Sequence, residues 1–472
     1  MPVIGAVAVP HPPLIMPEVG HGDEKAISKT IEAYRAVMKE AAALRPDVAF
    51  IVSPHAHCYQ DYFLISQWHF GRGDFGAFRA SELQIECDYD EEFVEALGEA
   101  FKRSEISGGT GNFIGLSDPL DHGTMIPLRF LQEFLPDIKV VRMGISGYSP
   151  LDHYRAGQAI AKVAEAQDKR LLFIASGDLS HGLKAEGPYG FVKEGPVFDA
   201  QICGIFKSGD FLKLLTMDEE LVEKSMNCGY LPFAVMAGAL DSLAVKPQLR
   251  SYEGPFGVGY AVASFAVAGE DPSRAFGKAY CKIQQAQAQK KEQAMDPLVK
   301  LAKATVDYTC KGLKGDAAWD QAERELEGRI PPELLQKRAG CFVTLHKFGR
   351  LRGCIGTILP VQGNLGLEII HNAVSACTSD PRFDAVSAAE LPYLEYSVDV
   401  LSDPEKIESE SRLDPKIYGV IVTKGSRRGL LLPDLDGVDS VRQQLEIAKR
   451  KAGLEPDEEG CALERFTVVR HF

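Results

Sequence analysis

Short apolar runs that alternate with helix-forming segments constrain the fold of this 472-residue chain more than any other feature. Residues 3–9 and 47–53 are runs rich in valine, isoleucine and alanine that suit buried strands, and residues 24–43 between them carry helix formers at helical spacing. Similar apolar runs return at residues 138–143, 171–175 and 258–267. Strands separated by helices form βαβ units. We therefore predict an α/β domain with a mostly parallel sheet and helices on both of its faces.

A polar segment separates this pattern from the rest of the chain. Residues 282–294 are rich in Gln, Ala and Lys and have no apolar face, which is typical of a solvent-exposed helical linker. A new amphipathic segment begins at Asp296. We predict three parts: the α/β domain at residues 1–275, a helical linker at 276–295, and a smaller α+β domain at 296–472.

Charge and cysteine usage exclude several classes of function. The chain has 52 Lys and Arg against 66 Asp and Glu, and a net charge of −14 disfavours binding to nucleic acids or anionic membranes. No apolar stretch has membrane-spanning length, and the start of the chain lacks the features of a signal peptide. The ten cysteines show no CxxC spacing, which indicates reduced thiols. We expect a cytoplasmic protein without a nucleic-acid or membrane partner, and a homodimer on general frequency.

Histidines follow three of the predicted strands directly. His11 follows the first strand, His55 and His57 follow the second, and His181 follows the strand at residues 171–175. Because the carboxyl ends of parallel strands line the ligand crevice of an open α/β sheet, these side chains are expected to converge. Two further polar residues lie in segments rich in glycine and proline, where the backbone can turn sharply, as it often does at a functional site. These are His122 and Glu253.

This set of residues predicts a metal site. Two histidines and one carboxylate, here His11, His55 and Glu253, make the facial arrangement that non-haem Fe(II) favours. Zinc is the alternative ion, and His57 the alternative third ligand, because imidazole binds zinc and iron alike. A single histidine at a loop end is as often structural as functional, but convergence of several favours a shared site.

Five segments together resemble the class III, LigB-type extradiol ring-cleavage dioxygenases, over the first ~270 residues. They are His11-Pro-Pro-Leu, Ser53-Pro-His55-Ala-His57, Asp121-His122-Gly-Thr-Met-Ile-Pro-Leu, Gly177-Asp178-Leu-Ser180-His181 and the segment around Glu253. The resemblance implies Fe(II) bound by His11, His55 and Glu253, with His122 and His181 as acid and base. It also implies a small aromatic, catechol-like substrate.

The expected roles of the remaining polar residues follow from this chemistry. His181 would take a proton from the second substrate hydroxyl, and His122 would donate to a developing oxygen anion, roles that need pKa values near neutrality. Asp178, three residues before His181, is expected to accept a hydrogen bond from that imidazole and orient it.

The second half of the chain carries a different pattern. Residues 341–347 and 351–355 predict a hairpin with its turn at 348–349. Arg352-Gly-Cys354-Ile-Gly, with Asp380-Pro-Arg382-Phe and Gly429-Leu-Leu-Leu-Pro, resembles the AMMECR domain family over nearly all of residues 296–472. Cys354 is a candidate nucleophile or thiolate ligand, with Arg352 stabilising its anion. A buried structural cysteine beside a solvent-facing Arg352 is the commoner arrangement.

The combination of domains suggests a partner. LigB-like, Memo-like and AMMECR-like modules resemble components of the prokaryotic AmmeMemoRadiSam system, which includes a radical SAM protein. No CxxxCxxC triplet occurs among the cysteines, so a radical SAM partner would be a separate protein. Three hypotheses follow: a non-haem iron oxygenase-like enzyme, a metal-binding component that serves the radical SAM enzyme, and an interaction scaffold whose metal site has degenerated.

Overall fold

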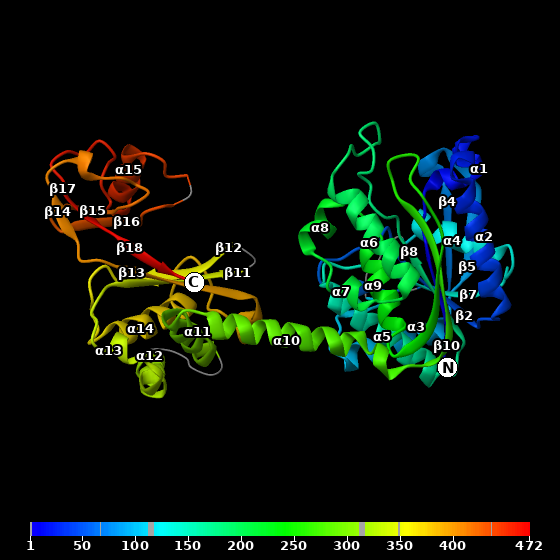
Figure 1. Ribbon diagram of the computed structural model, residues 1–472, viewed down its shortest axis with the longest axis horizontal. Coiled ribbons are helices and arrows are strands. Elements are labelled where there is room, and N and C mark those ends of the chain that lie inside the picture. The colour runs from blue at the N-terminus through cyan, green and yellow to red at the C-terminus, as the bar shows by residue number, and fades with distance from the viewer. Residues whose placement is uncertain (1, 67, 112–117, 311–316, 348–349, 436) are drawn as a thin grey trace. The chain divides into compact units, whose positions relative to one another are not determined.

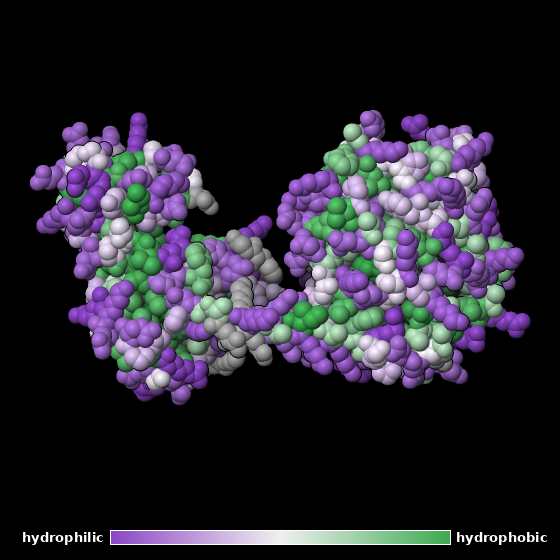
Figure 2. All heavy atoms as spheres, in the orientation of Figure 1, coloured by the Kyte–Doolittle hydropathy of each residue, from purple (hydrophilic) through white to green (hydrophobic). Residues whose placement is uncertain are grey.

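The computed structural model describes residues 2–66, 68–111, 118–310, 317–347, 350–435 and 437–472. The chain forms two compact units, Met1–Gln285 and Ala286–Phe472, and helix α10 (Phe276–Ala294) crosses the division between them. Figure 2 shows that hydrophilic residues dominate the visible surface of each unit, with smaller apolar patches among these hydrophilic residues. Within the described ranges, no helix combines the length and the apolar character needed to cross a membrane.

The first unit is built from strands and helices that alternate along the chain. Its principal strands are β1 (Val3–Val9), β2 (Val48–Ser53), β4 (Phe70–Phe75), β5 (Ala80–Asp88), β7 (Lys139–Gly144), β8 (Leu171–Ser176), β9 (Leu243–Glu253) and β10 (Tyr260–Glu270). Its principal helices are α2 (Ser28–Ala43), α3 (Glu91–Arg103), α4 (His122–Gln132), α5 (Pro150–Ala166), α6 (Glu194–Ser208), α8 (Glu219–Lys224) and α9 (Tyr230–Ala239). Short helices α1 (Pro17–Gly20) and α7 (Leu212–Leu215), and short strands β3 (Phe63–Leu64) and β6 (Gly108–Gly109), complete it.

Six of these strands form the central sheet, in the order β7-β2-β8-β1-β10-β9. Strands β7, β2, β8 and β1 are parallel, as the alternating pattern predicts. Strand β10 is antiparallel to both β1 and β9, so the apolar run at residues 258–267 does not extend the parallel part. Only residues 254–259 join β9 to β10, too few for the crossover helix that a parallel pair requires. The predicted α/β fold is confirmed, with a mixed central sheet.

Helices cover both faces of this sheet (Figure 1). Because side chains alternate along each strand, neighbouring residues of one strand face different cores. Phe50 and Phe173 face a core shared with α3, α5, α6 and α9. Ile51 and Ile174, one position further along, face a second core shared with α2 and α4. Burial on both faces explains why the strands read as continuous apolar runs rather than alternating ones.

The second unit is the predicted smaller α+β domain, with two antiparallel sheets. One sheet has the order β12-β11-β13-β18 and the other β14-β17-β15-β16. The strands are β11 (Cys341–Lys347), β12 (Arg350–Gly356), β13 (Leu394–Leu401), β14 (Glu405–Ile407), β15 (Gly419–Lys424), β16 (Arg427–Leu431), β17 (Ala462–Phe466) and β18 (Val468–His471). The helices are α11 (Pro297–Cys310), α12 (Ala317–Leu326), α13 (Pro332–Leu335), α14 (Leu365–Thr378) and α15 (Val441–Lys451). The predicted hairpin is confirmed as β11 and β12, and its turn at 348–349 lies outside the described residues.

Helices α5 and α9 pack backbone against backbone through two glycines. A Cβ atom at Gly157 would clash with the Val235 carbonyl oxygen, and one at Gly238 would clash with the Tyr154 carbonyl oxygen. Both neighbours are backbone atoms, which cannot move aside as a flexible side chain could. Glycine is therefore required where these two helices cross.

This packing predicts that Gly157→Ala lowers the free energy of unfolding by about 1–3 kcal/mol, because the helices must separate to admit the methyl group. Gly204→Ala is the matched control, since Gly204 is exposed in helix α6 with open space around its Cα. That change should raise stability by about 0.5–1 kcal/mol through helix propensity. Urea unfolding followed by circular dichroism measures both, and equal midpoints for the two variants would contradict the packing argument.

Candidate metal centre

Three segments that are distant in sequence bring two histidines and a cysteine together. His11 follows β1, His55 follows β2, and Cys228 lies just before helix α9. His11 Nε2 lies 3.0 Å from His55 Nε2 and 3.4 Å from Cys228 Sγ. The potential ligand atoms of all three side chains lie within 4.8 Å of one another. This is the spacing at which one ion can be shared.

The hydrogen bonds of His11 direct a lone pair of its ring toward this group. The Ser176 hydroxyl donates to the Gly123 carbonyl at 2.5 Å, so its oxygen accepts from His11 Nδ1 at 2.8 Å. With the proton on Nδ1, Nε2 carries the free lone pair. Burial lowers the pKa of His11 well below its usual value, and the neighbouring His55 lowers it further. The imidazole is therefore neutral, as a metal ligand must be.

Cys228 is placed by hydrogen bonds to the end of β8. The Asp178 amide donates to Cys228 Sγ at 3.3 Å, and the Gly229 amide donates to the Asp178 carbonyl at 3.0 Å. The two segments approach so closely that position 177 requires glycine, because a Cβ atom there would clash with the Gly229 backbone. Burial raises the pKa of the Cys228 thiol, and a bound cation would reverse that effect by stabilising the thiolate.

His122 and His181 lie beside this group. The His122 ring centroid is 4.2 Å from that of His55, and the His181 ring lies close enough to lower the pKa of His11. Burial lowers the pKa of His122 to about 4 and also lowers that of His181. The expected pKa near neutrality is therefore not found for His122, and both rings are neutral at pH 7. Among the described residues, His181 Nε2 is buried without a hydrogen-bond partner.

Aromatic side chains flank both of these histidines. The Phe78 ring lies edge-on to His122 at a centroid distance of 5.3 Å, and the Tyr189 ring lies over His181 at 5.0 Å. Tyr189 is exposed. Two aromatic rings therefore border the histidine group, and such rings can contact a planar organic molecule.

The structure does not bring Glu253 into this group. Glu253 ends strand β9, two strands away from β1, and its Oε2 accepts hydrogen bonds from the Thr30 amide at 2.8 Å and the Thr30 hydroxyl at 2.7 Å. Thr30 lies in the first turn of helix α2, where backbone amides lack partners within the helix. The carboxylate therefore satisfies the start of a helix, and Cys228 occupies the third position expected for Glu253.

Two other predicted residues also have different surroundings from those expected. His57 Nε2 lies 3.9 Å from the Asp118 carboxylate. Among the described residues, His57 does not belong to the group of His11, His55 and Cys228. Asp178 accepts a hydrogen bond from the His11 backbone amide at 2.8 Å rather than from the His181 ring. Burial raises the pKa of Asp178 to about 7, and its ligand atoms lie within 4.8 Å of those of His181 and Cys228.

Sequence reasoning missed Cys228 because it was grouped with nine other cysteines that have no common spacing. A usable signal was present. Cys228 lies between Asn227 and Gly229, directly before an apolar helix, in the same kind of glycine-flanked helix start that drew attention to His122. Asn227 Oδ1 caps that helix by accepting from the Tyr230 amide at 2.9 Å.

The donor set fits a transition metal. Two neutral imidazoles and one thiolate suit zinc, copper and iron, and the thiolate favours softer ions than a carboxylate does. A thiolate carries the same single negative charge as the expected carboxylate, so the total charge on a divalent ion is unchanged. Three protein ligands leave coordination positions for a small molecule.

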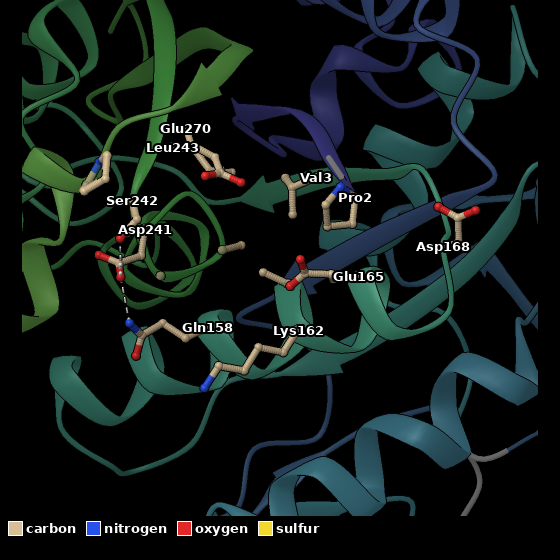
Figure 3. A pocket seen from close by; sticks show the side chains of 14 residues that line it. Pro2, Val3, Gln158, Lys162, Glu165, Asp168, Asp241, Ser242, Leu243 and Glu270 are labelled. Atoms are coloured by element: carbon tan, nitrogen blue, oxygen red, sulfur yellow. Dashed lines mark hydrogen bonds between the residues drawn. The ribbon is translucent and has the colours of Figure 1, made fainter.

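A hollow of about 480 Å³ lies at the amino ends of the parallel strands, away from the candidate metal centre (Figure 3). Pro2 and Val3 at the start of β1 line it, and Asp241 accepts from Gln158 Nε2 at 2.9 Å within it. Its described lining residues include no histidine or cysteine, and four of its five charged side chains are carboxylates.

Comparison with known families found a match for each half of the chain. The family described as the catalytic LigB subunit of aromatic ring-opening dioxygenase matches residues 5–263, and the AMMECR1 family matches residues 299–471. The chain belongs to the LigB family, with an AMMECR1 domain after the LigB domain. The resemblance predicted for both halves of the chain is confirmed. The LigB domain contains every residue of the candidate metal centre.

Similar proteins match the whole chain or part of it. A Clostridium acetobutylicum protein is 38% identical over 477 residues, which cover 100% of this chain and 99% of that protein. A Thermotoga maritima protein is 56% identical over 148 residues, 31% of this chain and 85% of that protein. A solved Pyrococcus horikoshii structure is 32% identical, with a TM-score of 0.32, and covers 37% of this chain and 88% of its own. An Escherichia coli K12 structure is 16% identical, with a TM-score of 0.37, over 55% and 99%.

In the AMMECR1 domain, Arg352 does not stabilise a Cys354 anion as expected. Arg352 donates from Nε and Nη2 to the Glu390 carboxylate at 3.0 and 3.1 Å. Gly353 pairs with Leu345 and Leu351 pairs with His346, so Arg352 is an extra residue without a partner on β11. This bulge turns Arg352 away from the face that Cys354 would otherwise share with it. Burial raises the pKa of the Cys354 thiol.

The Arg352 pair predicts an acid-sensitive contribution to stability. The hydrogen bonds from Arg352 hold the pKa of Glu390 well below its usual value. A depressed carboxyl pKa stabilises the fold above the unfolded pKa of about 4.3, and this contribution is lost as the pH falls below it. Glu390→Gln should therefore unfold about 1–3 kcal/mol more easily than wild type at neutral pH, with a difference that shrinks toward pH ~3. Glu408→Gln, at an exposed position, is the control, and a difference that is constant with pH would contradict the prediction.

Proposed function

We propose that the LigB domain is a metal-dependent, oxygenase-like enzyme that acts on an aromatic substrate with two adjacent oxygens, such as a catechol. The observation that supports this most is the convergence of His11, His55 and Cys228 beside two further neutral histidines. In this proposal His11, His55 and Cys228 hold the metal, and His122 and His181 face the substrate. Fe(II) or Zn(II) would suit the donor set.

The metal would act as a Lewis acid and as a template for the two substrate oxygens. His181 would take the proton of a substrate hydroxyl, because its Nε2 is buried with no other hydrogen-bond partner among the described residues. His122 would donate a hydrogen bond to the second oxygen from its neutral ring. Phe78 and Tyr189 would hold the aromatic ring between them and exclude water.

A second candidate function is favoured by Cys228. Thiolate binds zinc and copper more readily than it supports the oxygen chemistry of a histidine and carboxylate iron site. In this alternative the LigB domain binds metal and a small ligand without using oxygen, as a component that works with a separate radical SAM enzyme. The bound ion and oxygen uptake distinguish the two functions.

The identity of the third ligand can be tested directly by metal content. Cys228→Ser should lower the metal bound per chain by at least about ten-fold, because it removes the thiolate. Glu253→Gln is the matched comparison, since glutamine still accepts from the Thr30 amide and should leave the metal content unchanged. Anaerobic purification and elemental analysis give both values. If Glu253→Gln lost the metal and Cys228→Ser retained it, the proposed ligand set would be wrong.

The proton-transfer role predicts a separate result. Wild type loaded anaerobically with Fe(II) should consume oxygen when a catechol is added, and His181→Gln should slow this by at least about 100-fold while the metal content stays the same. His69→Gln is the control, because His69 is exposed and pairs with Glu91 away from the site. Metal binding without oxygen uptake in wild type would reject the oxygenase and leave the second candidate.

A further inference from the structure

The AMMECR1 domain contains a hollow of about 770 Å³ that has no role in the function proposed for the LigB domain. Both sheets of the domain line it, through strands β11, β12, β13 and β18 of one sheet and β16 of the other. Its volume is typical of a pocket for a small organic molecule.

One face of the first sheet is free to line this hollow because the other face is covered by helices. Val343 and Leu345 on β11 belong to the core shared with helices α11 and α14. Phe342 and Thr344, at the alternate positions, line the hollow. The hollow is therefore a consequence of strand alternation in a sheet that carries helices on one side only.

Part of the lining is apolar and only half-buried. Phe342, Leu430 and Leu432 pack around the buried Leu401 and Phe466, where the two sheets meet. Each of the three retains exposed surface toward the hollow. Apolar surface at the bottom of a pocket favours a ligand with an apolar body, since burying it releases about 25 cal/mol per Å².

The guanidinium groups in the lining are already held by carboxylates. Arg470 donates to Asp399 at 2.8 and 3.2 Å. Arg382 donates from Nε and Nη2 to Asp380 at 2.9 and 2.7 Å, and Asp380 also accepts from the Cys354 amide. Nη1 of Arg382 makes no hydrogen bond within the described part of the chain. These pairs fix both arginines in position.

Lys451 differs from them because it has no ion pair or hydrogen bond among the described residues. It ends helix α15 and lines the hollow near Cys354 and Arg382, whose charges affect its pKa. Lys451 is exposed overall, and partial burial of its ammonium group is the largest cause that lowers its pKa. Three carboxylates also line the hollow. Asp399 accepts from Arg470, Asp434 lies 3.7 Å from Lys416, and Glu395 lies opposite His346 on the neighbouring strand.

Cys354 also lines the hollow. The Thr344 hydroxyl donates to Cys354 Sγ at 3.1 Å. Thr344 in turn lies opposite Ser397 on β13, which also lines the hollow. Cys354 and Lys451 both line the hollow, so the reactivity of Cys354 can report on whether the hollow is occupied.

We propose that this hollow binds a small organic anion. Its anionic group, a carboxylate or sulfonate, would contact Lys451 and Nη1 of Arg382, and its apolar body would cover Phe342, Leu430 and Leu432. A lysine without an ion pair among the described residues, on the same hollow as an apolar surface, favours this combination, because an anionic ligand would pair with Lys451 and a cationic ligand would be repelled by it.

The test uses the full-length chain and three probes of the same length: octanoate, octanol and octylamine. Isothermal titration should show saturable binding of octanoate at about millimolar concentration or tighter, with octanol and octylamine at least ten-fold weaker. Lys451→Gln should weaken octanoate binding about ten-fold. Lys449→Gln, on the same helix and outside the hollow, is the matched control and should change binding less than two-fold.

Alkylation of Cys354 gives a second readout that does not depend on affinity alone. Octanoate should slow the reaction of Cys354 with iodoacetamide in wild type and leave the exposed Cys58 unaffected, as measured by peptide mass spectrometry. The proposal is overturned if octanoate neither saturates nor protects Cys354, if octylamine binds as well as octanoate, or if Lys451→Gln binds octanoate as tightly as Lys449→Gln. Thermal melting of both variants shows that the comparison is made between folded proteins.

Discussion

The shared edge of four parallel strands is the constraint on which the candidate metal centre depends. In the order β7-β2-β8-β1, each strand presents its carboxyl end at the same side of the sheet. His11 and His55 follow β1 and β2. Strand β8 lies between these two strands and ends at Ser176, and Asp178 follows it. Residues about 170 positions apart are therefore in hydrogen-bond contact, as the bond between the His11 amide and Asp178 shows.

The polar contacts around the candidate centre orient the side chains that could bind a metal. Ser176 fixes the proton of His11 on Nδ1, and Asp178 accepts the His11 amide while its own backbone holds Cys228. Burial keeps the surrounding imidazoles neutral. Burial also disfavours the Cys228 thiolate, so the thiol would ionise only with a cation beside it. Metal binding at this candidate centre would therefore be coupled to ionisation of Cys228.

The AMMECR1 domain uses the same kind of residues for different ends. Arg352 and Lys347 both donate to the Glu390 carboxylate and form a part-buried charged cluster with it. Lys451 and Cys354 instead border a hollow that the fold leaves open. A single bulged residue on β12 separates the two environments, because it turns Arg352 to the other side of the sheet from Cys354.

Local sequence pattern predicted the α/β class of the first domain, the hairpin of the second, and the convergence of His11, His55 and His181 after their strands. These follow because hydrophobic periodicity assigns strands, and parallel strands share an edge. His122 was included because of its glycine-rich segment and the family resemblance. The sequence could not show that Cys228 rather than Glu253 completes the group, or that residues 258–267 run antiparallel. Those outcomes depend on which loop packs against the end of β8 and on how few residues join β9 to β10. Such packing is decided only when the whole chain is folded, since the atoms that Glu253 and Cys228 contact lie 223 and 50 residues away.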